Sequence, residues 1–222
     1  MTTAEPWVTL EGINGVGKSY LAGEAARLLG DQCVPLVELP DSPPRLLPRT
    51  IIDALAAGGD PFLRTGHPRT ETLLLAALQV HRHETTAIGA GQVVLEDRGP
   101  HSVAIYQAAV LTGDAADPDQ TFAEAQSLLN LMTQWRPLPG KTILLVDEPA
   151  TCQRRFEERL GRPSRPSEIT LMERAAQLYD RFAAAVPHQL EVLDRRRLDD
   201  GSCVDAIVSA CQQAAHASGR MP

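Results

Sequence analysis

Residues Gly12–Ser19 read Gly-Ile-Asn-Gly-Val-Gly-Lys-Ser and match the pattern G-x-x-x-x-G-K-[ST] at every fixed position. A short apolar run, Trp7–Glu11, comes before this stretch, and an amphipathic helical pattern follows it as far as Leu29. The pattern binds phosphate when it connects a strand to a helix through a glycine-rich turn. The sequence therefore predicts a phosphate loop that binds a nucleoside triphosphate together with Mg²⁺.

The residues of this loop have separate expected roles. Backbone N–H groups of the glycines turn inward around phosphate oxygens, and the helix N-terminus adds a favourable dipole. We expect Lys18 to reach the β- and γ-phosphates and the Ser19 hydroxyl to ligate Mg²⁺. The residues expected to bind ATP are Gly12, Asn14, Gly15, Val16, Gly17, Lys18, Ser19 and Tyr20.

Further strands are expected along the chain, separated by helical patterns, at Val34–Leu39, Gln92–Glu96, Thr142–Val146 and Leu190–Leu193. Strands that alternate with helices predict a parallel sheet covered on both faces. We therefore expect an α/β fold of the P-loop NTPase type, with a five-stranded parallel sheet. Ligands of such sheets bind beyond the carboxyl ends of the strands.

Composition narrows the function classes. The 222 residues include 28 acidic and 21 basic ones, a formal charge of −7, which disfavours a general nucleic-acid binder. The longest aliphatic run, Leu73–Leu78, is too short to cross a membrane, and the first residues lack the pattern of a signal peptide. The four cysteines form no C-x-x-C pair. We expect a cytoplasmic protein with reduced thiols, no membrane contact and no metal site beyond Mg²⁺.

Two clusters of charge favour phosphoryl transfer. Asp97 and Arg98 stand side by side where a buried strand ends. Five arginines then surround a Pro/Gly-rich segment, and phosphoryl transfer needs positive groups around the migrating phosphate. These arginines are Arg154, Arg155, Arg159, Arg162 and Arg165.

Arg155 and Arg159 are four residues apart, so both project from one helix face. They could belong to a solvated surface on which they pair with Glu157 and Glu158. Beside a phosphate loop we favour the other interpretation, a short helical lid at about residues 155–168 that closes over the phosphates.

Two other classes of phosphate-loop protein fit less well. A switch GTPase needs an N-K-x-D motif, which the chain lacks. The run Ile143–Pro149 imitates the strand that carries the acidic pair of an ABC-type ATPase. The L-S-G-G-Q signature expected upstream of that strand is missing, so a non-kinase ATPase is the less favoured alternative.

Taken together, these motifs resemble the thymidylate kinase family of nucleoside monophosphate kinases. The resemblance extends over most of the chain, and its most specific part after the loop is the D-R-x-x-x-S-x-x-A-Y-Q pattern. The matching stretches are Leu10–Ser19, Thr70–Ala77, Asp97–Gln107, Arg155–Arg162 with Glu168, and Glu191–Asp194.

The resemblance implies a single P-loop kinase domain over residues 1–222 that transfers phosphate from ATP to a small nucleotide. Arg98 would hold the acceptor phosphate, and Asp97 would join Ser19 in ordering Mg²⁺. The implied catalytic residues are Lys18, Arg98, Arg155 and Arg159. Whether Arg162 or Arg165 joins them stays open. Relatives commonly dimerise, so a homodimer is a further expectation.

The same resemblance implies a set of acceptor-binding residues. Tyr106 is either a wall of this site or a core residue, because it is helically spaced from neighbouring valines. The implied set is Asn14, Leu75, Gln79, Asp97, Arg98, Ser102 and Tyr106.

Three departures from the family pattern concern the acceptor. Asn14 replaces an acidic residue near the acceptor sugar, Leu75 replaces the aromatic ring that stacks on the base, and Gln79 replaces the arginine that bonds the thymine edge. Losing the ring removes stacking, and a glutamine both donates and accepts. We therefore expect an acceptor other than dTMP, unless other residues rebuild the thymine site. A nucleoside kinase with Glu38 or Glu96 as general base is the neighbouring alternative.

Overall fold

The computed structural model describes residues 5–38, 46–187 and 189–217. The chain divides into two compact units. One consists of residues 1–37, 88–99 and 139–222 and is called the loop unit here. The other consists of residues 38–87 and 100–138 and is called the helical unit.

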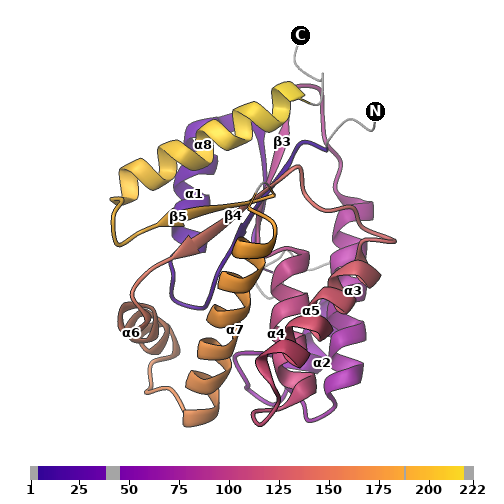
Figure 1. The fold of residues 1–222 in the computed structure, drawn as a ribbon. Coiled ribbons are helices and arrows are strands. Elements are labelled where there is room, and N and C mark those ends of the chain that lie inside the picture. Colours follow the sequence, from indigo (N-terminus) through magenta and orange to yellow (C-terminus); the bar gives the residue numbers. More distant parts are fainter. Residues whose placement is uncertain (1–4, 39–45, 188, 218–222) are drawn as a thin grey trace. The chain divides into compact units, whose positions relative to one another are not determined.

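The loop unit contains a five-stranded sheet in the order β2-β3-β1-β4-β5, in which all neighbours are parallel. The central strand β1 is buried at all five residues, as its apolar sequence predicts. Figure 1 shows the twist of this sheet. The strands are β1 (Trp7–Glu11), β2 (Cys33–Leu36), β3 (Val93–Asp97), β4 (Lys141–Val146) and β5 (Leu190–Asp194).

The register of the sheet brings two informative strand ends together. Leu10 of β1 lies opposite Asp97 of β3 and Ile143 of β4. The segments that follow β1 and β3 therefore leave the sheet side by side at its carboxyl edge. This is the edge at which parallel sheets bind ligands.

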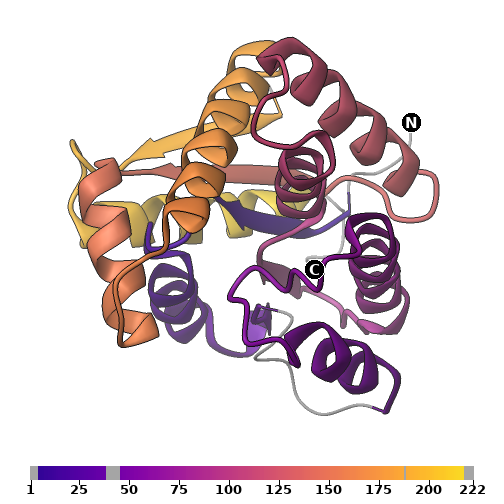
Figure 2. The same ribbon diagram turned by 90° about the horizontal axis from the view of Figure 1, so that it is seen from below.

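Helices cover both faces of this sheet. Figure 2 shows α7 on one face and α1 with α8 on the other. The helix α1 buries Leu21, Ala25 and Leu29, whose spacing of four residues forms one apolar stripe. The helices of this unit are α1 (Lys18–Leu29), α6 (Pro149–Leu160), α7 (Pro166–Ala185) and α8 (Asp200–Ala217), with a 3₁₀ turn η1 at Gly30–Gln32.

The helical unit holds four helices among the residues that the structure describes. The helix α4 packs against both α3 and α5 and is buried from Pro100 to Ala109. A hydrogen bond of 2.9 Å from the Thr72 hydroxyl to the Gln107 carboxamide oxygen joins α3 to α4. The helices are α2 (Leu46–Ala56), α3 (Pro68–Thr85), α4 (Pro100–Thr112) and α5 (Pro118–Met132).

The predicted α/β fold with a five-stranded parallel sheet is confirmed, and the differences lie at element ends. The second strand is Cys33–Leu36 and not Val34–Leu39, and Leu39 lies outside the described residues. The third strand ends at Asp97, one residue later than expected. Asp97 is therefore a ladder residue, and Arg98 is the first residue beyond the sheet.

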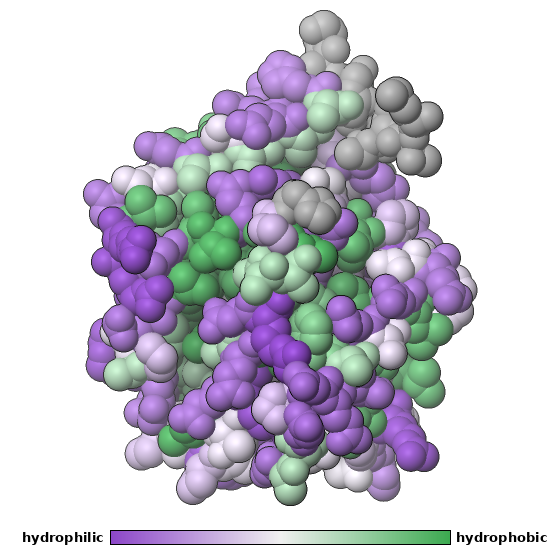
Figure 3. Space-filling view, in the orientation of Figure 1, coloured by the Kyte–Doolittle hydropathy of each residue, from purple (hydrophilic) through white to green (hydrophobic). Residues whose placement is uncertain are grey.

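The face drawn in Figure 3 mixes hydrophilic and hydrophobic residues. Large apolar side chains that are exposed include Leu73 and Trp135, and single exposed residues of this kind are normal. Within the described ranges, every helix is too short or too polar to be a candidate for crossing a membrane.

Candidate active site

The phosphate loop connects β1 to α1 and runs beside the first turn of α6. Gly15 has φ of 78°, and a Cβ atom at this position would overlap the backbone carbonyl of Cys152. Only glycine therefore fits here without movement of the backbone. Cys152 is fully buried, and burial raises the pKa of its thiol to about 11, so it is a neutral packing residue under the loop.

Gly15→Ala is expected to destabilise the protein by about 2–5 kcal/mol, because it combines an unfavourable φ with overpacking against backbone. The matched control is Gly23→Ala, an exposed site within α1 where a Cβ meets nothing within 4 Å. That change should stabilise the protein by about 0.5–1 kcal/mol. Urea denaturation measures both. A free energy of unfolding for Gly15→Ala within about 0.5 kcal/mol of wild type would contradict the packing described here.

Lys18 lies inside the loop and not on the surface. Its side chain is 4% exposed, and its ammonium donates to the carbonyl oxygens of Gly12 and Ile13 at 3.0 and 2.9 Å. Three N–H donors on one ammonium allow such contacts to be exchanged for phosphate oxygens. Lys18, which the motif assigns to the β- and γ-phosphates, is thus held at the loop by neutral carbonyl oxygens that phosphate oxygens can replace.

Ser19 and Asp97 meet at the start of α1. The Ser19 hydroxyl donates to a carboxylate oxygen of Asp97 at 2.5 Å, although the residues are far apart in the chain. A hydroxyl and a carboxylate are the hard oxygen donors that Mg²⁺ takes, and Mg²⁺ usually binds only one or two protein groups besides water and phosphate. The pair therefore fits Mg²⁺. The described residues contain no cluster of three or more acidic, histidine or cysteine ligands.

The backbone of Arg98 is held in an uncommon conformation. Its φ is 66°, in the left-handed region that costs a non-glycine residue about 1–3 kcal/mol. The Arg98 N–H donates to the Leu10 carbonyl at 3.1 Å, and the Gly99 N–H donates to the Glu11 carboxylate at 3.0 Å. Glu11 is fully buried and also accepts from the Tyr179 hydroxyl at 2.9 Å. The strained turn is therefore fixed by β1 and α7 together.

The guanidinium of Arg98 lies on the phosphate loop. It donates to the Gly12 carbonyl oxygen at 3.3 Å and to the side-chain oxygen of Asn14. The same carbonyl oxygen of Gly12 accepts from Lys18. Two cationic side chains, one from the start of α1 and one from the residue after β3, thus converge on one oxygen atom.

The predicted lid, residues 155–168, comprises the end of α6, the connection and the start of α7. Arg155 donates to the Asp147 carboxylate at 2.7 Å, and Arg159 lies over the Phe156 ring at 5.4 Å. The solvated-surface interpretation applies to Arg154, which pairs with Glu158 where both side chains are 62% exposed. Arg155 instead belongs to a half-buried pair at the end of β4.

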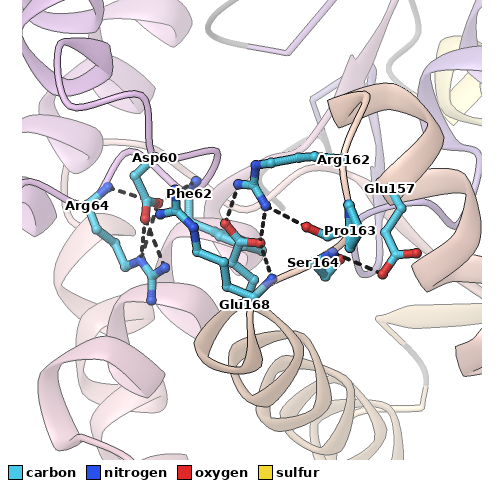
Figure 4. Close-up of polar contacts among 9 residues, drawn as sticks. Asp60, Phe62, Arg64, Glu157, Arg162, Pro163, Ser164 and Glu168 are labelled. Carbon is cyan, nitrogen blue, oxygen red and sulfur yellow. Dashed lines mark hydrogen bonds and ion pairs between the residues drawn. The ribbon is translucent and has the colours of Figure 1, made fainter.

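The connection between α6 and α7 is organised by Glu168, as Figure 4 shows. Its carboxylate accepts two bonds from the Arg162 guanidinium, at 2.9 and 2.6 Å, and one from the Arg165 N–H at 2.8 Å. Pro166 opens α7, because proline suits the first helical position. Arg162 is thus bound to the lid itself.

Glu168 also makes the lid sensitive to acid. The hydrogen bonds from Arg162 lower the pKa of Glu168 to about 2 from its ordinary 4.5. A carboxyl whose pKa falls on folding stabilises the native state above the unfolded pKa. This contribution is therefore complete above about pH 4.5 and is lost as the pH falls towards 2.

Glu168→Gln is expected to lower the free energy of unfolding at pH 7 by about 2–3 kcal/mol, less than the roughly 3–5 kcal/mol for breaking a fully buried pair, because Arg162 is 32% exposed. The matched control Glu158→Gln, in an exposed pair, should change it by less than about 1 kcal/mol. Urea denaturation from pH 7 to 3 measures both. A difference between wild type and Glu168→Gln that grows below pH 4.5 would contradict this assignment.

The remaining predicted acceptor residues lie in the helical unit. Leu75 and Gln79 are buried on α3, and Ser102 and Tyr106 are buried on α4. The Tyr106 ring stacks on Phe62, with centroids 5.8 Å apart, which agrees with a packing role. The Asp60 carboxylate holds the segment that carries Phe62 (Figure 4), accepting from its N–H at 2.8 Å.

Comparisons with known proteins identify relatives of this chain in one family. A thymidylate kinase from Clavibacter sepedonicus is 32% identical over 196 residues, covering 85% of this chain and 86% of that protein. The chain belongs to the thymidylate kinase family. A probable thymidylate kinase from Methanocorpusculum labreanum is 30% identical over 157 residues, covering 70% of this chain and 72% of that protein. No family model matches the chain.

The fold agrees as well. The crystal structure of thymidylate kinase from Ehrlichia chaffeensis superposes with a TM-score of 0.61, at 17% identity, over 93% of this chain and 97% of that one. Membership of the thymidylate kinase family confirms the predicted P-loop NTPase fold and the expectation of an ATP-dependent nucleotide kinase.

Sequence reasoning did not place Arg136 beside Gln79, a position at which this chain differs from the thymidylate kinase pattern. Arg136, just beyond α5, is 1% exposed and donates to the carboxamide oxygen of Gln79. No motif marks Arg136, which stands between a tryptophan and a proline. Its link to Gln79 spans 57 residues, so only the folded chain reveals it.

Proposed function

We propose that this chain transfers the γ-phosphoryl group of ATP to the phosphate of an acceptor nucleotide held by Arg98. One observation carries the proposal: Lys18 and Arg98 donate to the same carbonyl oxygen, that of Gly12. Phosphoryl transfer needs donor and acceptor phosphates held adjacent and in line, with positive charge around both. Two converging cations, one from the phosphate loop and one from the end of β3, supply such an arrangement.

Each residue has a defined task in this proposal. The loop and Lys18 hold the donor phosphates, and Arg98 orients the acceptor phosphate. Ser19 and Asp97 hold Mg²⁺, which neutralises charge on the donor phosphates when bound. An oxygen of the acceptor phosphate forms a bond to the γ-phosphorus while the bond from that phosphorus to the bridging oxygen breaks and ADP leaves. No protein nucleophile is needed, because the acceptor phosphate is already ionised.

The lid completes the proposal. Arg155 and Arg159 would close over the γ-phosphate, stabilise its charge and exclude water, which would otherwise be phosphorylated in place of the acceptor. Arg155 is bonded to Asp147, so closure involves exchanging that carboxylate for phosphate. The bonds between Arg162 and Glu168 favour a structural task for Arg162. Function as one domain over residues 1–222, a homodimer and a cytoplasmic location stay predictions.

We further propose that the acceptor is not dTMP. Asn14 contributes a neutral amide that accepts from Arg98, and Leu75 is an aliphatic residue buried to 7% exposure. Gln79 is 1% exposed, with its oxygen engaged by Arg136. These three positions lack the acid, the ring and the arginine of the family pattern. A nucleotide with a different base or sugar suits it better.

The second candidate acceptor is dTMP itself, and one observation favours it. Arg136 brings a guanidinium to Gln79, the position at which the family pattern has an arginine. An arginine supplied from another part of the chain would be one way to rebuild recognition of a carbonyl edge.

The nucleoside kinase alternative is less well supported. One of the two candidate general bases, Glu96, is fully buried and accepts from the Thr9 hydroxyl at 3.0 Å. A general base must reach the proton that it removes. Glu38, the other candidate, is half-buried and lies in the helical unit.

A coupled assay of ADP release across the common ribo- and deoxynucleoside monophosphates, with the parent nucleosides as controls, tests the proposal. We expect one monophosphate to exceed dTMP in kcat/KM by at least about tenfold, a difference of about 1.4 kcal/mol in transition-state binding. Nucleosides should be inert. Preference for dTMP would contradict the specialised acceptor, and preference for a nucleoside would contradict the phosphate acceptor.

A further inference from the structure

Arg195 follows β5 directly and turns back onto the phosphate loop. Its N–H donates to the Val146 carbonyl at 2.9 Å, which extends the ladder between β4 and β5 by one residue. This bond fixes the point at which the side chain leaves the sheet. The side chain is only 7% exposed, which is unusual for an arginine that no motif of the chain singles out.

The guanidinium of Arg195 has two partners in the loop unit. It donates through one terminal nitrogen to the carbonyl oxygen of Val16 and through the other to the carboxylate of Asp200, at the start of α8. A Cβ atom on Gly17 would overlap the nitrogen that bonds Val16. The guanidinium therefore packs directly on the Gly17 backbone, and only a glycine allows this approach.

The bond to Val16 controls the direction of the next N–H group. The Val16 carbonyl and the Gly17 N–H belong to one planar trans peptide, so they point in opposite directions. When the carbonyl points to Arg195, the Gly17 N–H points away from it. A charged donor on the carbonyl also polarises the peptide and makes its N–H a stronger donor.

We propose that Arg195 is a positioning residue for the donor triphosphate: it holds the Val16–Gly17 peptide in the orientation in which the Gly17 N–H binds a donor phosphate oxygen. Phosphate loops bind through such inward N–H groups. The proposal rests on the proposed ATP site. The bond from Arg195 to Asp200 ties this peptide to the start of α8 and limits its rotation.

Arg195→Met removes both hydrogen bonds but keeps an unbranched, apolar stem at this position. We expect this variant to weaken MgATP binding, measured by isothermal titration calorimetry, at least tenfold. The KM for ATP should rise by a similar factor, while kcat and the KM for the acceptor change less than threefold. The ¹⁵N–¹H signal of Gly17 should lose most of the shift that MgATP causes in wild type, a readout that a general loss of stability does not produce.

Arg196→Met is the matched control. Arg196 is the next residue, carries the same charge and bonds Asp194 at the surface, with its side chain 47% exposed. It should bind MgATP within twofold of wild type. Arg195→Lys keeps the charge but cannot donate in a planar fork to two acceptors, so a rise in Kd of threefold or more is expected. If Arg195→Met fails to fold, the Kd of Arg195→Lys for MgATP tests the inference instead.

Three results would overturn the inference. The first is a Kd for MgATP within twofold of wild type in Arg195→Met, or in Arg195→Lys if only that variant folds. The second is an equal weakening of MgATP binding in Arg196→Met, which would indicate a general charge effect. The third is a Gly17 signal that shifts on MgATP binding as it does in wild type. Failure of wild type to bind MgATP would overturn the proposed ATP site and this inference together. Binding by wild type with unchanged Arg195 variants would overturn this inference alone.

Discussion

Arg98→Ala is expected to lower kcat/KM for the acceptor by about a thousandfold or more, the range seen when one charged donor is removed from a phosphoryl-transfer site. The guanidinium of Arg98 lies on the phosphate loop through Gly12 and Asn14, and a truncated side chain leaves the acceptor phosphate without its cation. Because the acceptor phosphate must also be aligned, both kcat and the acceptor KM should deteriorate. Steady-state kinetics with the preferred monophosphate measure the effect.

Two further variants serve as comparisons for the kcat/KM of Arg98→Ala. Arg98→Lys keeps the charge but loses the planar fork, so its kcat/KM should lie between those of Arg98→Ala and wild type. Arg174→Ala, near the middle of α7, should stay within threefold of wild type. The assignment of Arg98 to the acceptor phosphate fails if Arg98→Ala also stays within threefold of wild type.

Lys18→Ala is expected to reduce turnover by about a thousandfold or more, because the loop loses the cation that balances charge on the β- and γ-phosphates. The ammonium of Lys18 bonds the carbonyl oxygens of Gly12 and Ile13. When ATP binds, phosphate oxygens would replace these carbonyl oxygens as acceptors for the Lys18 ammonium. Weaker binding of MgATP should accompany the lost turnover.

The chain offers one natural control for this variant. Lys141, at the start of β4, is the second of its two lysines and pairs with Glu191, where both side chains are partly exposed. Lys141→Ala should keep wild-type kinetics, since exposed pairs contribute little. Thermal denaturation should find both variants folded. Near-normal turnover by Lys18→Ala would remove the phosphate loop from the mechanism.

Local patterns were sufficient to predict the sheet and the loop. The apolar run Ile143–Val146 of β4 is continuous, β1 is buried at all five residues, and the glycine pattern directly follows β1. The end of β2 was harder to predict, because among the described residues this strand pairs with β3 alone and contains Pro35, which cannot donate to a ladder. The order of the strands depends on crossovers that no local pattern encodes.

The residues that sequence reasoning missed all act across large separations in the chain. Glu11 meets Tyr179 at a separation of 168 residues, and Arg195 meets Val16 at a separation of 179. No periodicity or spacing relates such pairs. Lid arginines were recognised as a cluster, but only the folded chain distinguishes Arg155, which bonds Asp147, from Arg162, which bonds Glu168.

The most direct test of the central claim is a ³¹P NMR time course with MgATP, the purified protein and a mixture of nucleoside monophosphates. If this chain transfers phosphate to a nucleotide, the γ-phosphate signal of ATP disappears as the α- and β-phosphate signals of a new nucleoside diphosphate appear, with ADP as the other product. Conversion of ATP to ADP and inorganic phosphate at a rate independent of any monophosphate would contradict this claim.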